Sequence, residues 1–160
     1  MKIPTAGDVM ERNVICVGTD TPLLDVHRLF VEEEIHGAPV VDGDGSVVGV
    51  ITSTDLLRAV EEEHDTMRVQ SDYFRDLLPY SSPDWSASSE DFQDRLSELR
   101  AEDVMARHVL TVPAQASVSD VARVLRENGI HRVFVSEEGR MLGVVSAFDL
   151  LRLVEDWKES

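Results

Sequence analysis

The sequence predicts an α+β protein made of two pseudo-symmetric repeats, each folding as β-α-β-β-α, with a helical insertion between them. Its 160 residues, 42% of them apolar, are enough to bury a core without disulfides. The strongest signal is internal repetition, because residues 8–10 (Asp-Val-Met) recur as residues 103–105 and the same order of patterns follows each copy. Roughly twenty of about 54 aligned positions are identical, far above chance.

Within each copy, the local patterns predict the elements in the order strand, helix, strand, turn, strand, helix. Valine-rich runs predict strands at residues 14–17, 38–41 and 48–51, and again at 109–112, 133–135 and 142–145. Helical periodicity covers residues 23–33 and 118–128. Thr19 or Asp20 is expected to cap the first of these helices, with Pro22 near its first turn, and Ser117 the second. One copy alone leaves a sheet face uncovered, so the two copies are expected to form one body.

The chain is expected to divide into a first repeat (residues 1–60), an acidic and partly helical insertion (61–100) and a second repeat (101–160). The insertion carries eleven acidic residues against four arginines, and its apolar spacing predicts a short amphipathic helix at Phe92, Leu96 and Leu99. It also holds too many large apolar side chains for a solvated linker, namely Tyr73, Phe74, Leu77, Leu78 and Trp85. We expect it to pack on the repeats or across a dimer; a partner-binding surface is the alternative.

Charge and composition exclude several classes of partner. The formal charge of −16 repels phosphate backbones, so nucleic-acid binding is not expected, whereas a small phosphate needs only a local cluster of donors. The sequence has no apolar run that could cross a membrane and no secretory signal, and a cytoplasmic location is expected. Cys16, the single cysteine, lies in an apolar run and is expected to be buried and inert.

Two short segments carry the residue types that could bind a nucleotide. They are residues 49–55 (Gly-Val-Ile-Thr-Ser-Thr-Asp) and 143–149 (Gly-Val-Val-Ser-Ala-Phe-Asp). Each lies where a strand should end and a helix begin, and the N–H groups of a helix start favour an anion. The hydroxyl of Thr52 or Ser146 can donate to a phosphate, and the carboxylate of Asp55 or Asp149 can accept ribose hydroxyls. The same spacing is also an ordinary helix cap, so both interpretations stay open.

Together with the repeat, the Asp-Val-Met openings and the Ile-His pairs at 35–36 and 130–131, these segments resemble the ribose-phosphate motifs of cystathionine-β-synthase-type (CBS) domains. The resemblance covers about 120 of the 160 residues and is that of a stand-alone CBS pair, or Bateman module. It implies a regulatory protein that holds an adenine nucleotide in a cleft between its repeats. Apolar side chains would enclose the base, and backbone N–H and C=O groups would read its edge.

Carried over by position, the resemblance implies two ligand sites. One would use Thr52, Thr54 and Asp55, with adenine near Val104, Ile130 and His131. The other would use Ser146 and Asp149, with adenine near Val9, Ile35 and His36.

The two implied sites differ in their phosphate donors. Arg132 follows the second Ile-His pair where Gly37 follows the first, and a guanidinium can hold phosphate through two parallel bonds. Against this, the second segment has Phe148 at the position where the first has Thr54, so the second site lacks one hydroxyl. We therefore expect the site of Arg132, Ser146 and Asp149 to be the stronger one; the alternative is that Arg132 pairs with a surface acid.

The histidines do not indicate a metal site. The five of them, at positions 27, 36, 64, 108 and 131, show no ligand spacing, so no metal is expected. His36 and His131 could add positive charge and pH sensitivity near a phosphate, or could be half-buried polar residues at strand starts. No nucleophile–base pair, Walker loop or GxGxxG turn is present, so no catalytic activity is expected.

The resulting functional expectation is a ligand sensor. AMP, ADP or ATP is expected as ligand, ahead of NAD and S-adenosylmethionine. By resemblance, two chains should form a homodimer through their helices, and an unknown protein partner could receive the signal. The alternative is a structural interaction module whose clefts stay empty and whose acidic insertion is the working surface.

Overall fold

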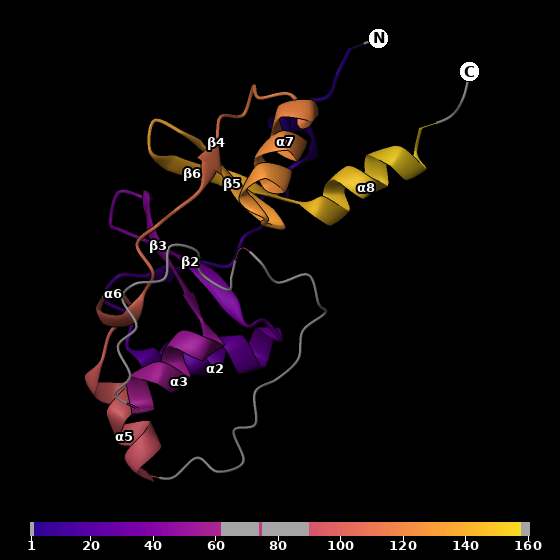
Figure 1. The fold of residues 1–160 in the computed structure, drawn as a ribbon. Coiled ribbons are helices and arrows are strands. Elements are labelled where there is room, and N and C mark those ends of the chain that lie inside the picture. The colour runs from indigo at the N-terminus through magenta and orange to yellow at the C-terminus, as the bar shows by residue number, and fades with distance from the viewer. Residues whose placement is uncertain (1, 62–73, 75–89, 158–160) are drawn as a thin grey trace. The chain divides into compact units, whose positions relative to one another are not determined.

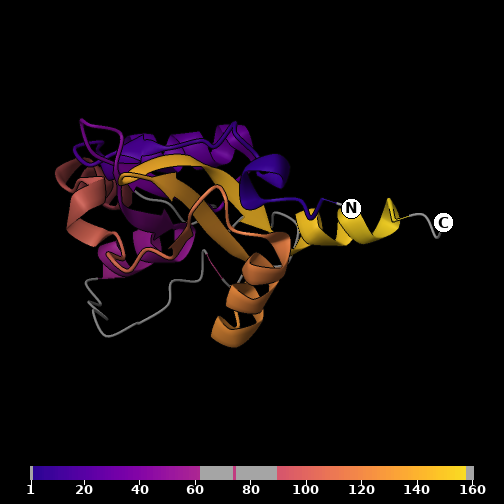
Figure 2. The same ribbon diagram turned by 90° about the horizontal axis from the view of Figure 1, so that it is seen from above.

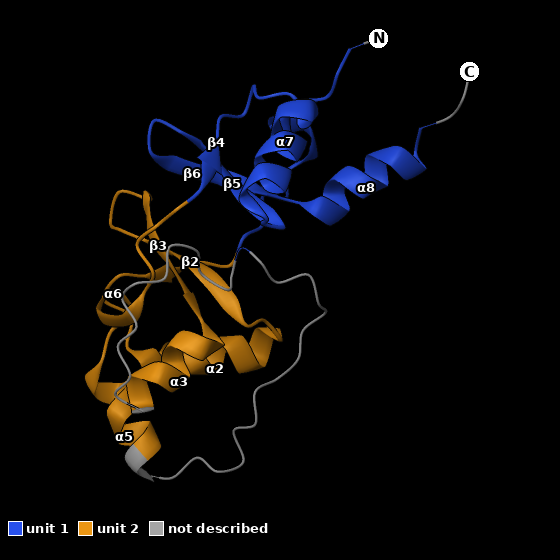
Figure 3. Cartoon of the chain, in the orientation of Figure 1, with its two compact units in different colours: residues 1–14, 74–76, 110–160 blue, residues 15–73, 77–109 orange. Residues whose placement is uncertain are grey.

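The computed structural model describes residues 2–61, 74 and 90–157. The chain divides into two compact units, unit 1 with residues 1–14, 74–76 and 110–160, and unit 2 with residues 15–73 and 77–109 (Figure 3). Each unit therefore combines the sheet and helices of one repeat with the Asp-Val-Met opening of the other. The sequence repeat and the compact unit in space are different divisions of this chain.

Unit 2 is built on a three-stranded sheet in the order β1-β2-β3, of which β2 and β3 are labelled in Figure 1. The strands are β1 (Val17–Gly18), β2 (Gly37–Val41) and β3 (Val47–Thr52), with β1 parallel to β2 and β2 antiparallel to β3. The helices are α2 (Leu23–Glu33), α3 (Ser53–Glu61), α5 (Glu90–Glu98) and α6 (Ala101–Val104). The core joins sheet, α2, α3 and α5 through Leu23, Val26, Phe30, Ala38, Val40, Ile51, Leu56 and Leu96.

Unit 1 repeats this topology in the order β4-β5-β6. It contains α1 (Ala6–Val9), β4 (Thr111–Val112), α7 (Val118–Asn128), β5 (Arg132–Glu137), β6 (Arg140–Ser146) and α8 (Ala147–Glu155). The predicted β-α-β-β-α order is thus confirmed in both copies, although the opening strands β1 and β4 are shorter than the apolar runs suggested. Figure 2 shows α8 projecting away from the sheet of its own unit.

The two longest helices begin in different ways. Ser117 caps α7 as predicted, because its side chain accepts a hydrogen bond from the backbone N–H of Asp120. The predicted cap of α2 by Thr19 or Asp20 is wrong, since that helix begins only at Leu23. There the Leu23 N–H donates instead to the carbonyl of Leu99, at 2.9 Å.

The exchanged opening segments explain one glycine in each repeat. Each opening pairs with the last strand of its unit through two backbone hydrogen bonds, Ala106 with Val50 at 2.9 and 2.8 Å and Glu11 with Val144 at 2.8 and 3.0 Å. A Cβ on Gly49 would lie 2.7 Å from the Ala106 carbonyl oxygen, and one on Gly143 would lie 2.5 Å from that of Glu11. Both distances are too short for a side chain, so this approach requires glycine.

The insertion contributes its predicted amphipathic helix, α5, to unit 2. Leu96 is fully buried, Phe92 and Leu99 pack against the core, and the Arg95 Nε donates to the Ala59 carbonyl at 3.5 Å. The other large apolar residues named from the sequence, Tyr73, Leu77, Leu78 and Trp85, lie outside the described residues. Cys16 is half-buried, and its burial raises the pKa of the thiol. In the described part of the chain, no helix is long and apolar enough to cross a membrane.

Candidate functional site

In unit 1, the candidate site is the start of α8. Ser146 and Asp149 form a capping box: the Asp149 Oδ2 accepts from the Ser146 N–H at 2.8 Å, and the Ser146 Oγ accepts from the Asp149 N–H at 3.2 Å. The Ala147 N–H donates to the His131 carbonyl at 2.8 Å. The N–H of Phe148 has no partner among the residues that the structure describes. One helix-start donor and one Asp149 oxygen, Oδ1, are therefore left for a ligand.

The register of the hairpin places Arg132 beside this helix start. Arg132 on β5 pairs directly with Ser146 on β6, so their side chains leave neighbouring strands at the same level. Asp149 follows one helical turn after Ser146. The backbone thus brings an arginine, a serine and an aspartate to one strand–helix junction, and a sugar phosphate offers groups that match these three residue types.

In unit 2, the same geometry holds at the start of α3, with its groups more fully engaged. The Asp55 Oδ2 accepts from the N–H of Thr52 at 2.8 Å and from its Oγ1 at 3.1 Å. Thr52 is buried, with 2% of the residue exposed. Arg58 lies 3.7 Å from the other carboxylate oxygen of Asp55, Oδ1, and both side chains are largely buried. Both oxygens of this carboxylate already have partners.

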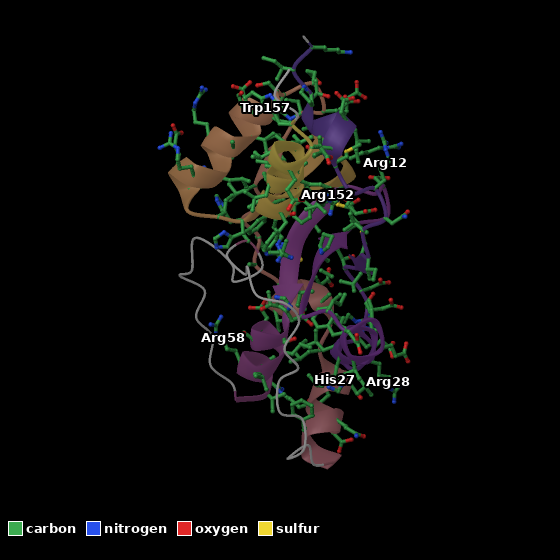
Figure 4. All side chains as sticks on the ribbon, turned by 90° about the vertical axis from the view of Figure 1, so that its right-hand side faces the viewer. Arg12, His27, Arg28, Arg58, Arg152 and Trp157 are labelled. Atoms are coloured by element: carbon green, nitrogen blue, oxygen red, sulfur yellow. The ribbon has the colours of Figure 1, made fainter. Side chains whose placement is uncertain are left out.

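The corresponding positions in the two units differ in charge. Gly37 pairs with Thr52 where Arg132 pairs with Ser146, so unit 2 has no cation on this strand position. Arg152 on α8 corresponds to Arg58 on α3 (Figure 4). Arg152 is exposed, and no ion pair with Asp149 is found across the described residues.

The predicted site residues fall into two groups of six. Unit 1 holds Val9, Ile130, His131, Arg132, Ser146 and Asp149, and unit 2 holds Ile35, His36, Thr52, Thr54, Asp55 and Val104. Within unit 1, the backbone joins His131 to the start of α8; within unit 2, the Ser53 N–H donates to the His36 carbonyl at 2.8 Å. The expected contributions of Ile130 and His131 to the Thr52 site, and of Ile35 and His36 to the Ser146 site, stay predictions.

The role of Phe74 was missed by the sequence reasoning. Its carbonyl accepts from the His131 N–H at 2.6 Å, and its ring meets that of Phe134 edge-on, with centroids 5.7 Å apart. The excess of large apolar residues in the insertion predicted packing of this kind. It gave no means of telling which of those residues would dock, or where.

A metal centre finds no support in the part of the chain that is described. Within residues 2–61, 74 and 90–157, no three His, Cys, Asp or Glu side chains lie close enough together to hold an ion.

Comparison with known families decides the relationship. The CBS domain family matches residues 6–62 and 101–156, which are the two copies of the internal repeat. The chain belongs to the CBS domain family. The resemblance drawn from the motifs is thereby confirmed, and the two sequence repeats are the two CBS domains of a pair.

Several relatives share most of the chain. The uncharacterised protein MJ1426 of Methanocaldococcus jannaschii is 30% identical over 150 residues, which cover 90% of this chain and 87% of that protein. The chain spans only 43% and 62% of the length of two further relatives. Among solved structures, the CBS domain of a CBS domain-containing membrane protein from Sphaerobacter thermophilus is 29% identical, with a TM-score of 0.68 over 94% of this chain and 88% of that one.

Two structures with the same fold were solved with ligands. CBSX2 in complex with AMP is 24% identical, with a TM-score of 0.66 over 98% of this chain and 99% of that one. The CBS domain pair of protein MJ0100, in complex with 5′-methylthioadenosine and S-adenosyl-L-methionine, is 21% identical, with a TM-score of 0.64 over 98% of this chain and 100% of that one. The ligands are properties of those proteins, and the likeness establishes the shared fold.

Proposed function

We propose that this chain is a regulatory module that binds an adenine nucleotide, AMP, ADP or ATP, and does so first at the start of α8. The observation that carries the proposal is the pairing of Arg132 with Ser146, one turn before Asp149. No catalytic role is assigned to these groups, because none of them forms a nucleophile–base pair.

Each group has a distinct task in this proposal. Arg132 binds the phosphate through its planar guanidinium, and the N–H of Phe148 adds a donor at the positive end of the helix. Asp149 accepts hydrogen bonds from the ribose hydroxyls with the carboxylate oxygen, Oδ1, that its capping box leaves over. Ser146 holds Asp149 in place through the capping box.

The ligands of related folds support an adenosine compound without selecting one. CBSX2 was solved with AMP, and MJ0100 with 5′-methylthioadenosine and S-adenosyl-L-methionine. An arginine at the ligand site favours a phosphorylated member of this group, because a guanidinium attracts a phosphate but not the neutral thioether of 5′-methylthioadenosine or the sulfonium cation of S-adenosylmethionine. This ranks AMP, ADP and ATP ahead of S-adenosylmethionine.

The output of such a sensor passes through self-association or a protein partner in this proposal. α8 exposes three large apolar side chains, Phe148 (58%), Leu151 (56%) and Val154 (62%), and Trp157 (72%), two residues after the end of the helix, adds a fourth to the row. A row of this kind is typical of an interface, and we propose that it forms a homodimer. Coupling requires that the nucleotide bind one association state better than the other, and the start of the same helix holds Asp149.

A thermal-shift screen with AMP, ADP, ATP, NAD and S-adenosylmethionine tests the proposal. We expect the nucleotides to raise the melting temperature, since a ligand of the folded state stabilises it by mass action. Arg132→Gln should abolish most of that rise for AMP. Arg126→Gln is the matched control. Arg126 is an exposed arginine on α7, so this substitution removes the same charge at a position away from the site.

A second function is favoured by the capping boxes themselves. Thr52 and Asp55 bond to each other and to Arg58, so these residues could serve the fold alone. The chain would then be an interaction module that uses its acidic insertion. The absence of stabilisation by every compound in the screen, at millimolar concentration, would favour this second function.

A further inference from the structure

Phe74 is anchored in unit 1 although it comes from the insertion between the repeats. None of its surface is exposed, and its carbonyl oxygen lies 2.6 Å from the backbone nitrogen of His131. Its ring packs edge-on against Phe134 at an interplanar angle of 78°. A buried backbone hydrogen bond and an aromatic pair thus hold one residue in a specific place.

The sheet places this contact on the face away from α7. Ala38 and Val40 of β2 pack with α2 in the core of unit 2, and the repeat aligns them with Val133 and Val135 of β5. Successive strand residues point to opposite faces, so Phe134, between these two valines, points away from the helix. Phe134 is itself fully buried, with Phe74 against it.

Phe74 occupies the His131 N–H, one of the backbone groups that the family resemblance implies for an adenine base. The family resemblance assigns the backbone at Ile130 and His131 to the edge of the base. An adenine ring nitrogen is a hydrogen-bond acceptor, as is the Phe74 carbonyl, and the His131 N–H is a single donor. A base and Phe74 therefore compete for one position.

We propose that Phe74 is an internal competitor for the adenine base at His131. The inference rests on the proposed function and adds a regulatory rule to it. A nucleotide reaches His131 only in the fraction of molecules from which Phe74 has left, so its apparent affinity there falls by that fraction. The first nucleotide binds at Arg132, Ser146 and Asp149. A second nucleotide, with its base at His131, binds only when Phe74 is displaced, so its binding depends on the contact that the insertion makes through Phe74.

Calorimetric titration of AMP into the full chain and its Phe74→Ala variant tests the inference. The wild-type chain should bind one AMP tightly, and the variant should bind a second AMP with an affinity raised roughly tenfold or more. Phe92→Ala is the control, because Phe92 is an aromatic residue of the same insertion that contacts His27 in unit 2. The control should keep the wild-type stoichiometry. ATP and S-adenosylmethionine are titrated in parallel.

The outcomes separate the inference from the proposed function. If AMP, ATP and S-adenosylmethionine bind to neither chain, the proposed function fails, and the inference with it. If AMP binds both chains with equal stoichiometry and affinity, the proposed function stands and the competitor role of Phe74 is overturned. Hydrogen exchange adds a direct readout, because the His131 amide should exchange faster in Phe74→Ala and slow again when AMP is added.

A milder variant keeps the test decisive if Phe74→Ala does not fold. Phe74→Leu retains an apolar side chain and loses the aromatic contact with Phe134, so it should still weaken the competitor. A higher apparent affinity for the second AMP supports the inference. Unchanged binding of AMP by a folded Phe74→Leu chain overturns it.

Discussion

The two units share one topology and the same helix-start capping box, yet they prepare these groups for different tasks. In unit 2, Asp55 is bonded to Thr52 and paired with Arg58, and α5 packs against α3. In unit 1, the Asp149 carboxylate keeps an unoccupied oxygen among the described residues, and Arg132 stands opposite Ser146. Duplication has preserved the backbone geometry while the side chains have diverged, so equal folds here do not mean equal sites.

Both units share a close backbone approach of the opening segment to the last strand, at Gly49 and at Gly143. Substitutions at these two glycines should have the largest effect on stability. Gly143→Ala places a Cβ 2.5 Å from the Glu11 carbonyl oxygen, and Gly49→Ala places one 2.7 Å from that of Ala106. The backbone must move in either case, and each substitution should lower the free energy of unfolding by about 1–3 kcal/mol. Urea denaturation of both variants measures this.

Gly43→Ala is the matched control for these two variants. A Cβ at Gly43 meets nothing within 4 Å, so the unfolding free energy should change little. If Gly49→Ala and Gly143→Ala are as stable as the Gly43→Ala chain, the opening segments do not lie on the strands as described.

The difference between the helix-start carboxylates gives the second prediction. Asparagine keeps a side-chain oxygen that can accept the capping hydrogen bond, but it lacks the negative charge that binds ribose hydroxyls. Asp149→Asn and Asp55→Asn therefore test ligand binding while the helix cap is retained. Asp149→Asn should weaken binding of the first AMP by roughly tenfold to a hundredfold, since hydrogen bonds to charged groups are the stronger ones. Asp55→Asn should leave the first binding event within about twofold of the wild type. Calorimetry measures both, and equal losses from the two variants would contradict the ranking of the sites.

Much of the architecture could be predicted from the repeat. Residues 23–33 and 118–128 form helices with the predicted bounds, because a stripe of apolar residues at helical spacing leaves little choice of burial. The strand–turn–strand order followed from valine-rich runs around Asp-Gly-Asp-Gly. Family membership followed from the same repeat, since two motifs at equivalent positions are far more specific than one.

Contacts between distant segments could not be predicted in the same way. The start of α2 depends on the carbonyl of Leu99, more than seventy residues along the chain. No sequence pattern near Thr19 indicates this hydrogen bond. The same applies to the docking of Phe74 at His131. Arg132 was chosen from the sequence because it follows the second Ile-His pair, whereas its pairing with Ser146 across the hairpin is known only from the structure.

The exposed side of α8 gives the third prediction, on self-association. Leu151→Glu places a charge in the middle of the apolar row and should weaken dimerisation roughly tenfold, as a central interface residue does. Val31→Glu is the control, because Val31 is an exposed apolar residue on α2, at 45%. Sedimentation equilibrium measures both variants. A dimer that survives Leu151→Glu but dissociates with Val31→Glu would move the interface to unit 2.

The smallest expected effect is an acid sensitivity of unit 2 at His27. This side chain lies beside Arg28 on α2 (Figure 4). Its ring meets that of Phe92 on α5 edge-on, with centroids 6.0 Å apart. Burial, and then the charge of Arg28, lower the pKa of His27 below its ordinary value of 6.5. The folded chain therefore binds fewer protons than the unfolded chain, so stability from this group is complete above pH 6.5 and declines as the pH falls below it. His27→Gln should flatten the decline of the denaturation midpoint between about pH 7 and pH 5. An identical decline in both chains would show that other groups carry the acid sensitivity, and that the contact between α2 and α5 does not depend on the charge of His27.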